Sequence, residues 1–244
     1  MIEKYTKSFN IGFRDVDRSM KLRMSSLVDY MQEIGGEHAN QLGLNFFGQE
    51  KEVYWIVSRA KMYLEEYPNW EETITIKTYP AGIDKLFAVR RFDIYNKQNE
   101  AIGYIIGDYI LMDTGTNRPV RPSGLKGNFE KLCYPYEGEV LPKLKAPVTI
   151  TLQDIRKARY SEIDVNGHMN NAHYVRWAVD MMTAKEHVQK EVQSIQTNYV
   201  TSIVEGDEVT MIRGLDEEGH TLVQGTSLDG KIIYFTSKMV FKDL

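Results

Sequence analysis

The sequence has a single cysteine, Cys133, among its 244 residues. An internal disulfide needs two cysteines, so the hydrophobic core has to hold this fold, and a cysteine-based zinc site is not plausible. His168 and His173 are five residues apart, which is a poor spacing for two ligands on one helix face, and no H-E-x-x-H motif occurs. We therefore expect neither a metal nor a cofactor, and we interpret Cys133 as a bystander.

Long apolar runs and an excess of positive charge are also missing. No stretch approaches the roughly 20 apolar residues that a membrane-spanning helix needs. The first residues show neither an apolar signal core nor a small-residue cleavage site. The net charge of -4 differs from the basic balance that is usual in nucleic-acid binders. These absences predict a cytoplasmic protein that neither spans a membrane nor binds nucleic acid.

Three motifs of common enzyme classes are absent: the G-x-S-x-G nucleophile elbow, the Walker phosphate loop and the G-x-G-x-x-G dinucleotide loop. The chain does have enough apolar residues (42%) beside its charged ones (26%) for a packed globular core. Its length allows one large domain or two small ones.

An internal repeat favours two domains. The stretch 13–31 resembles 160–181 when Asp17 is aligned with Asp164, which follows it by 147 residues. At this spacing apolar positions meet apolar positions, so two units of similar length fill the chain. Five of the seven prolines fall within 115–148.

Each unit has the same order of predicted elements: a short strand, a helix, and then a run of strands. The apolar residues at helical spacing are Leu27, Tyr30, Met31 and Ile34 in the first unit and Tyr174, Trp177, Ala178, Met181 and Met182 in the second. After each helix, segments rich in Ile, Val, Tyr and Thr alternate with turn signals, as is typical of antiparallel strands. A long buried helix wrapped by one curved sheet satisfies this order in each half, which predicts an α+β fold. We assign 1–125 to the first domain, 126–148 to a linker and 149–244 to the second domain.

The polar stretch Asp164-Val165-Asn166-Gly167-His168-Met169-Asn170-Asn171 is the strongest candidate site. It places an acid, an amide and an imidazole on the turn from a strand into a helix, with Asn170 or Asn171 as the helix cap. A helix N-terminus at this point favours developing negative charge, as on a thioester carbonyl oxygen under attack. The alternative is a polar capping loop with an incidental histidine. The equivalent turn that begins at Asp17 keeps the aspartate but lacks the Asn and the His, so we assign function to the second copy.

These residues resemble the acyl-ACP thioesterases, which release fatty acids from acyl carrier protein (ACP). The D-x-N-x-H-x-N-N turn looks like the signature of that family. The first half looks like it independently, in Trp55-Ile56-Val57-Ser58-Arg59, Tyr67-Pro68-x-Trp70 and Met112-Asp113 with Arg118-Pro119. The resemblance covers almost the whole chain and implies a tandem pair of hotdog domains, each a helix wrapped by an antiparallel sheet.

The resemblance also implies the activity and the partner. The C-terminal hotdog would hydrolyse fatty acyl-ACP to free fatty acid and ACP, which terminates fatty acid synthesis, and the N-terminal hotdog would supply most of the acyl pocket. The implied substrate-binding residues are Leu27, Tyr30, Met31, Ile34, Trp55, Asn170 and Asn171. An acidic ACP calls for a basic docking patch, for which Lys85, Arg90 and Arg91 are candidates together with Arg118 and Arg121.

Catalysis is assigned to Asp164, Asn166 and His168, acting on the attacking water and the thioester. Plant members carry a catalytic Glu at the position of Ser202, so Ser202 is a further candidate and the general base is open among Asp164, His168 and two nearby acids, Glu162 and Glu205. A regular strand would point 202 and 205 to opposite faces. A covalent acyl–Asp164 intermediate is a second mechanism.

Two other functions fit the same residues. One is hydrolysis of acyl-CoA, since the chemistry at the thioester is the same. The other, from a different class, is a non-catalytic acyl-binding protein. The sequence sets neither the acyl chain length nor whether the chain is a monomer or a homodimer.

Overall fold

The computed structural model describes residues 4–44, 53–122 and 134–244. The chain divides into two compact units. The first comprises Met1–Arg23 and Tyr30–Leu141, and the second comprises Met24–Asp29 and Pro142–Leu244. Within the described parts, no helix is long and apolar enough to cross a membrane.

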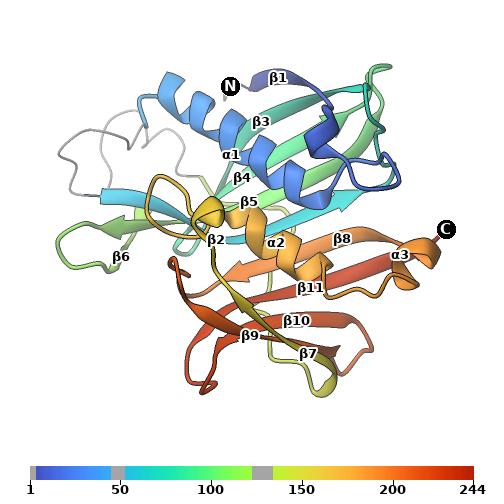
Figure 1. Cartoon of the computed structure of the whole chain (residues 1–244). Helices are drawn as coiled ribbons and strands as arrows, with labels where there is room; N and C mark the ends of the chain where they lie inside the picture. The colour runs from blue at the N-terminus through green and yellow to red at the C-terminus, as the bar shows by residue number, and fades with distance from the viewer. Residues whose placement is uncertain (1–3, 45–52, 123–133) are drawn as a thin grey trace. The chain divides into compact units, whose positions relative to one another are not determined.

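An antiparallel sheet with the strand order β1-β3-β4-β5-β2 forms the first unit. Its elements are β1 (Tyr5–Asn10), α1 (Met24–Gln41), β2 (Val53–Leu64), β3 (Thr73–Asp84), β4 (Phe87–Tyr95), β5 (Ala101–Asp113) and the short β6 (Pro119–Val120), which pairs with β5. From Tyr30 onward, α1 covers one face of this sheet (Figure 1). The ring of Tyr30 stacks on Phe9 of β1 with centroids 4.3 Å apart, and Gly35 lies against Phe92 of β4.

The second unit repeats this arrangement with the strand order β8-β11-β10-β9-β7. Its elements are β7 (Thr149–Lys157), α2 (Asn171–Val179), α3 (Glu186–Gln189), β8 (Lys190–Tyr199), β9 (Glu208–Leu215), β10 (Thr221–Ser227) and β11 (Ile233–Asp243). The ring of Tyr174 on α2 meets Tyr199 and Phe235 edge-on, each with centroids 5.3 Å apart. A helix packed on an antiparallel sheet in each unit confirms the predicted tandem hotdog (Figure 1).

The second helix is shorter than its apolar stripe predicts. α2 ends at Val179, half the length of α1, whereas Met181 and Met182 follow it and are still buried. The spacing of apolar residues indicates which side chains are buried, but it does not show that the backbone is helical. Side chains in a compact turn can be buried as fully as those on a helix.

The repeat of 147 residues holds in the backbone. Val16 forms an isolated antiparallel bridge with Leu22, and Ile163 forms the equivalent bridge with Met169. The short 3-10 helix at Phe13–Asp15 likewise has a counterpart at Tyr160–Glu162. The two halves are therefore built alike at the turn that carries the candidate site.

Residues 134–141 of the predicted linker pack on the first unit, whereas 142–148 belong to the second. We call residues 134–141 the strap. Two backbone bonds join it to Ile83 of β3, from the Ile83 N–H to the Tyr134 carbonyl (2.7 Å) and from the Tyr136 N–H to the Ile83 carbonyl (3.0 Å). Leu141 at its end is fully buried in a cluster with Val89 and Ile106. The strap thus covers the outer face of the first sheet, while Cys133 and the preceding residues back to 123 lie outside the described residues.

Candidate functional site

Side-chain hydrogen bonds of Asp164 shape the turn at Asp164–His168. Asp164 Oδ1 accepts the backbone N–H of Asn166 at 2.8 Å, and Oδ2 accepts its side-chain amide at 3.4 Å. The backbone N–H of Asp164 donates to the His168 carbonyl at 2.8 Å, and Gly167 adopts a φ of 77°. Asn166 and His168 are exposed, whereas Asp164 is half-buried. The turn therefore presents an amide and an imidazole to solvent on a frame that the aspartate holds.

A buried tyrosine ties this turn to the loop after β8. The N–H of Met169 donates to the carbonyl of Ile203 at 2.8 Å, and the N–H of Ile203 donates to the hydroxyl oxygen of Tyr174 at 3.0 Å. Burial raises the pKa of Tyr174 to about 12, so this hydroxyl stays neutral at physiological pH. The loop that contains Ser202 is thereby fixed beside the candidate turn.

Ser202 and Glu205 are not on a strand. β8 ends at Tyr199, and both residues are exposed in the loop that leads to β9. Strand alternation therefore does not apply to these two residues, because β8 ends before them.

Glu162 has a structural position. Its Oε2 accepts the backbone N–H of Arg159 at 2.9 Å, and its Oε1 accepts the indole N–H of Trp177 at 2.8 Å. His173 lies 3.7 Å from the same Oε1, and its pKa is lowered by burial and by the charge of Arg176. Because both carboxylate oxygens already bind protein donors, Glu162 is poorly placed to take a proton from water.

Two backbone N–H groups at the start of α2 already have hydrogen-bond acceptors within the protein. Asn170 is its N-cap, with Oδ1 accepting the N–H of Ala172 at 2.9 Å and its carbonyl accepting the N–H of His173 at 2.9 Å. The carbonyl of Asn171 accepts the hydroxyl of Tyr199 at 3.4 Å. The predicted cap is confirmed, but these two helix N–H groups are occupied and are not available to a thioester oxygen.

One backbone N–H group is hydrogen-bonded differently in the two copies of the turn. In the first copy the N–H groups of Ser19 and Lys21 both donate to Asp17 Oδ1, at 2.7 and 3.3 Å. In the second copy only the N–H of Asn166 reaches the aspartate. Within 4–44, 53–122 and 134–244, the backbone N–H of His168 has no hydrogen-bond acceptor. The second copy therefore presents one backbone donor whose counterpart in the first copy is bound by the aspartate.

The predicted acyl-pocket residues are in the interior. Leu27, Met31 and Ile34 on α1 are fully buried and Tyr30 is 7% exposed. Trp55 on β2 is half-buried. This burial suits a core as well as a pocket lining, so their role in substrate binding stays a prediction.

The predicted docking residues do not form one patch. Lys85 is exposed in the turn between β3 and β4. Arg90 points inward and donates to Nδ1 of His38 at 2.8 Å, whereas Arg91 on the other face of β4 pairs with Asp93 at 2.8 Å. The alternation of strand side chains gives the reason and could have been read from the sequence. His38 is only 1% exposed.

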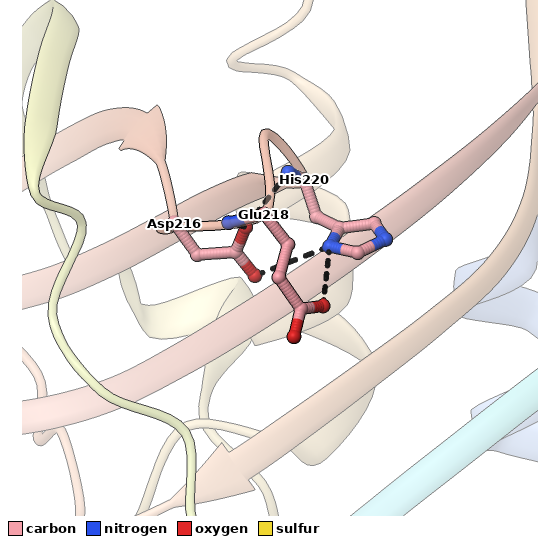
Figure 2. Close-up of side chains that lie close together, drawn as sticks. All are labelled: Asp216, Glu218 and His220. Carbon is pink, nitrogen blue, oxygen red and sulfur yellow. Dashed lines mark hydrogen bonds and ion pairs between the residues drawn. The ribbon is translucent and has the colours of Figure 1, made fainter.

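Figure 2 shows a second cluster of titratable side chains, at the turn between β9 and β10. One ligand atom each of Asp216, Glu218 and His220 lies within 4.8 Å of the others. The ammonium of Lys238 already lies 3.1 Å from Asp216 and 3.8 Å from Glu218. Asp216 Oδ1 also accepts the backbone N–H groups of Glu218 and His220, at 3.0 and 2.8 Å. We interpret the cluster as the ion-pair network that closes the β9–β10 hairpin, because a metal ion would have to displace Lys238.

Comparisons with known proteins point in one direction. The family model described as "Acyl-ACP thioesterase N-terminal domain" matches residues 2–123, and "Acyl-ACP thioesterase C-terminal domain" matches 148–231. An oleoyl-acyl carrier protein thioesterase of Arabidopsis thaliana is 20% identical over 225 residues, covering 84% of this chain and 62% of that protein. A dodecanoyl-[acyl-carrier-protein] hydrolase of Umbellularia californica is 23% identical, covering 80% and 55%. The chain thus spans less than two thirds of the length of these plant relatives.

Solved structures show the same fold over the whole chain. An acyl-ACP thioesterase from Bacteroides thetaiotaomicron superposes with a TM-score of 0.85 at 24% identity, covering 98% of both chains. The 12:0-ACP thioesterase from Umbellularia californica superposes with a TM-score of 0.84 at 18% identity, covering 99% of this chain and 98% of that one.

Proposed function

Because the chain belongs to the acyl-ACP thioesterase family, we propose that it hydrolyses fatty acyl-ACP to free fatty acid and ACP in the cytoplasm, terminating fatty acid synthesis. The observation that carries the proposal is the difference between two copies of one turn. Both copies share their backbone, but only the second displays Asn166 and His168 to solvent and leaves the His168 N–H for a ligand.

The turn supplies the groups that thioester hydrolysis needs. His168 takes a proton from water, and the resulting hydroxide attacks the thioester carbonyl carbon. Negative charge develops on the carbonyl oxygen, where the His168 backbone N–H and the Asn166 amide are donors on the same turn. The C–S bond then breaks, and the proton held by His168 passes to the leaving thiolate. Asp164 holds Asn166 in place through its carboxylate.

The test is thiol release from acyl-ACP by the wild type and by His168→Ala. We expect the variant to lose about 100-fold or more in kcat, since a positioned general base contributes about 100- to 10,000-fold. The matched control is Lys21→Ala, at the equivalent position of the plain copy, which should keep its rate. No release by the wild type above buffer, or equal rates for both variants, would contradict the assignment.

Acyl-CoA hydrolysis is the second candidate function. Docking of an acidic carrier protein on a basic surface distinguishes ACP from CoA as the carrier. Lys85, Arg118 and Arg121 are exposed, so they replace Arg90 and Arg91 as the candidate basic surface for an acidic carrier. Lys85→Glu should raise KM for acyl-ACP at low salt while leaving acyl-CoA unchanged. Equal efficiency on both carriers, with no effect of salt, would favour acyl-CoA.

The alternative of a non-catalytic acyl-binding protein rests on Ser202, which stands where a catalytic glutamate was expected. It predicts retention of a long-chain acyl thioester without turnover, so single-turnover mixing separates it from slow catalysis.

A further inference from the structure

In each unit the turn that begins at the aspartate is hydrogen-bonded to a short loop further along the chain. These loops are Asn69–Glu72 in the first unit and Val204–Asp207 in the second, and we call them the first and second loops. In each loop the N–H of the last residue donates to the carbonyl of the first at 3.2 Å, and the carboxylate of the last residue accepts the N–H of the first, at 2.8 Å and 3.0 Å. The third residue has a positive φ, of 67° at Glu71 and 91° at Gly206. The residues of the two loops therefore correspond one to one.

Two backbone hydrogen bonds join the turn and the loop region in the first unit. The N–H of Leu22 donates to the carbonyl of Pro68 at 2.9 Å. The N–H of Trp70 donates to the carbonyl of Met20 at 2.9 Å. In the first unit the turn and the loop thus satisfy each other's backbone groups.

The second unit keeps the former bond and lacks the latter. The N–H of Met169 donates to the carbonyl of Ile203 at 2.8 Å, as its counterpart does in the first unit. The counterparts of the other pair are the N–H of Glu205 and the carbonyl of Gly167, and neither has a hydrogen-bond partner in the part of the chain that the structure describes. Because the loop and the neighbouring bond are the same in both units, the second unit leaves open one donor and one acceptor that the first unit bonds together.

The open carbonyl belongs to the same peptide group as the N–H donor assigned to the thioester oxygen. In a trans peptide the C=O and the N–H point in opposite directions. In the first copy this peptide group directs its N–H, that of Lys21, to Asp17 and its C=O to the first loop. The open pair of Gly167 and Glu205 is therefore a site next to the His168 N–H and separate from it.

Exposed apolar side chains accompany the open pair. Val165 in the turn is 89% exposed and Val204 in the second loop is 42% exposed. The equivalent positions of the first unit hold the polar residues Arg18 and Asn69. Ligand sites combine apolar side chains with a few placed polar groups. The second turn has this combination where the first has polar residues and a closed hydrogen bond.

We propose that the Glu205 N–H and the Gly167 carbonyl bind one secondary amide of the pantetheine arm that carries the acyl chain. The inference rests on the proposed function, in which the substrate is an acyl thioester. The N–H and C=O of a trans amide point in opposite directions, so an amide between turn and loop donates to Gly167 and accepts from Glu205. The N–H groups of Val204 and Asp207 are already bonded within the loop, so the site fits a single amide and not a peptide strand.

The first test replaces each of the two pantetheine amides in turn by an ester, which keeps the carbonyl but exchanges the N–H for oxygen. We expect wild-type kcat/KM for the acyl thioester to fall about 3- to 10-fold with one of the two isosteres, as for loss of one hydrogen bond. Equal kcat/KM for the natural arm and both isosteres would overturn the proposal. ACP and CoA both carry this arm, and wild-type kcat/KM for acyl-ACP and acyl-CoA shows which carrier supplies it.

The second test removes the donor from the protein. Glu205 precedes Gly206 at a φ of 91°, and proline is common at this position of such a turn. Glu205→Pro removes the N–H, whereas Glu205→Ala removes the side chain and keeps the N–H. We expect the preference for a pantetheine thioester over a thioester of a plain alkanethiol to be about 3- to 10-fold smaller in Glu205→Pro than in Glu205→Ala. The same preference in both variants would contradict a role of this N–H.

A binding measurement separates the subsite from the proposed activity. S-alkyl pantetheine is a thioether that cannot be hydrolysed, and it is titrated calorimetrically into both variants. Weaker binding to Glu205→Pro than to Glu205→Ala supports the subsite even if no thioester is hydrolysed. Hydrolysis of pantetheine thioesters together with equal binding to the two variants retains the proposed function and refutes the subsite. If Glu205→Pro fails to fold, the ester isosteres decide the question with the wild type alone.

Discussion

Asp108→Asn should remove a pH-dependent loss of stability from the first unit. Asp108 on β5 is 4% exposed on the face beneath the strap. Arg59 is 3.9 Å from its carboxylate, and the Arg59 guanidinium already donates to the carbonyl of Leu141 and stacks on Phe87. Burial raises the pKa of Asp108 to about 7, and the charge of Arg59 only partly opposes this effect.

The sign follows from proton linkage. The folded state binds this proton more tightly than the unfolded state, so the wild type is most stable below the unfolded pKa of about 3.9 and loses stability as the pH rises to about 7. The difference between the unfolded and folded pKa values corresponds to a loss of about 4 kcal/mol in the free energy of unfolding, at about 1.4 kcal/mol per pH unit. This value is an upper limit because water reaches a buried carboxylate. Asparagine keeps the shape but cannot ionise. We expect Asp108→Asn to match the wild type near pH 4 and to exceed its stability by about 2 kcal/mol at pH 8.

Urea unfolding of both proteins at pH 4, 6 and 8 measures this difference. The control is Asp216→Asn, where burial alone would raise the pKa but the backbone N–H of His220 and the ammonium of Lys238 lower it to about 2. That carboxylate stabilises the fold above about pH 4 and loses its effect as the pH falls to 2, so this variant should be destabilised at pH 8. A stability difference between Asp108→Asn and the wild type that is constant from pH 4 to 8 would refute the reasoning.

Two further predictions concern the candidate turn. Asn170→Ala removes the cap of α2 and should cost about 1 kcal/mol of stability, whereas Asn170→Asp should cost much less, as thermal unfolding of both variants would show. Gly167 and its counterpart Met20 both have positive φ, of 77° and 64°. Gly167→Ala should therefore destabilise by about 1 kcal/mol although nothing lies within 4 Å of the added Cβ, and Met20→Gly should not destabilise. If Gly167→Ala and Met20→Gly changed the free energy of unfolding by the same amount in the same direction, the idea that the two turns share one backbone conformation would be contradicted.

Local hydrogen bonds explain why the turn could be read from the sequence. An aspartate that accepts N–H groups two to four residues ahead needs no distant partner, so Asp17 and Asp164 mark the same backbone in both halves. The strands were also readable, because alternation and turn residues act over a few positions. Asp216–Gly219, for example, closes a hairpin, with Gly219 at a φ of 84°.

Tertiary contacts explain what the sequence did not reveal. Arg90 and Arg91 are adjacent and look like one basic patch, yet α1 covers the face that carries Arg90. The strap lies in the proline-rich stretch that predicted a linker, but the buried Leu141 shows that it packs onto the first sheet. Helix α1 is far from Arg90 in the sequence, and the sheet residues that contact the strap are far from Leu141. Local sequence patterns therefore do not reveal either contact.

The comparison of the two turns also bears on the two mechanisms left open for Asp164. The same aspartate occurs in the plain copy, where Asp17 accepts the N–H of Ser19. Because no catalytic role is assigned to the first copy, the aspartate is explained there by the structure of the turn alone. In the second copy Asp164 Oδ1 is held in the same way by Asn166, which lowers its nucleophilicity. The groups that differ between the copies are Asn166 and His168, so the repeat favours water attack assisted by His168 over an acyl–Asp164 intermediate.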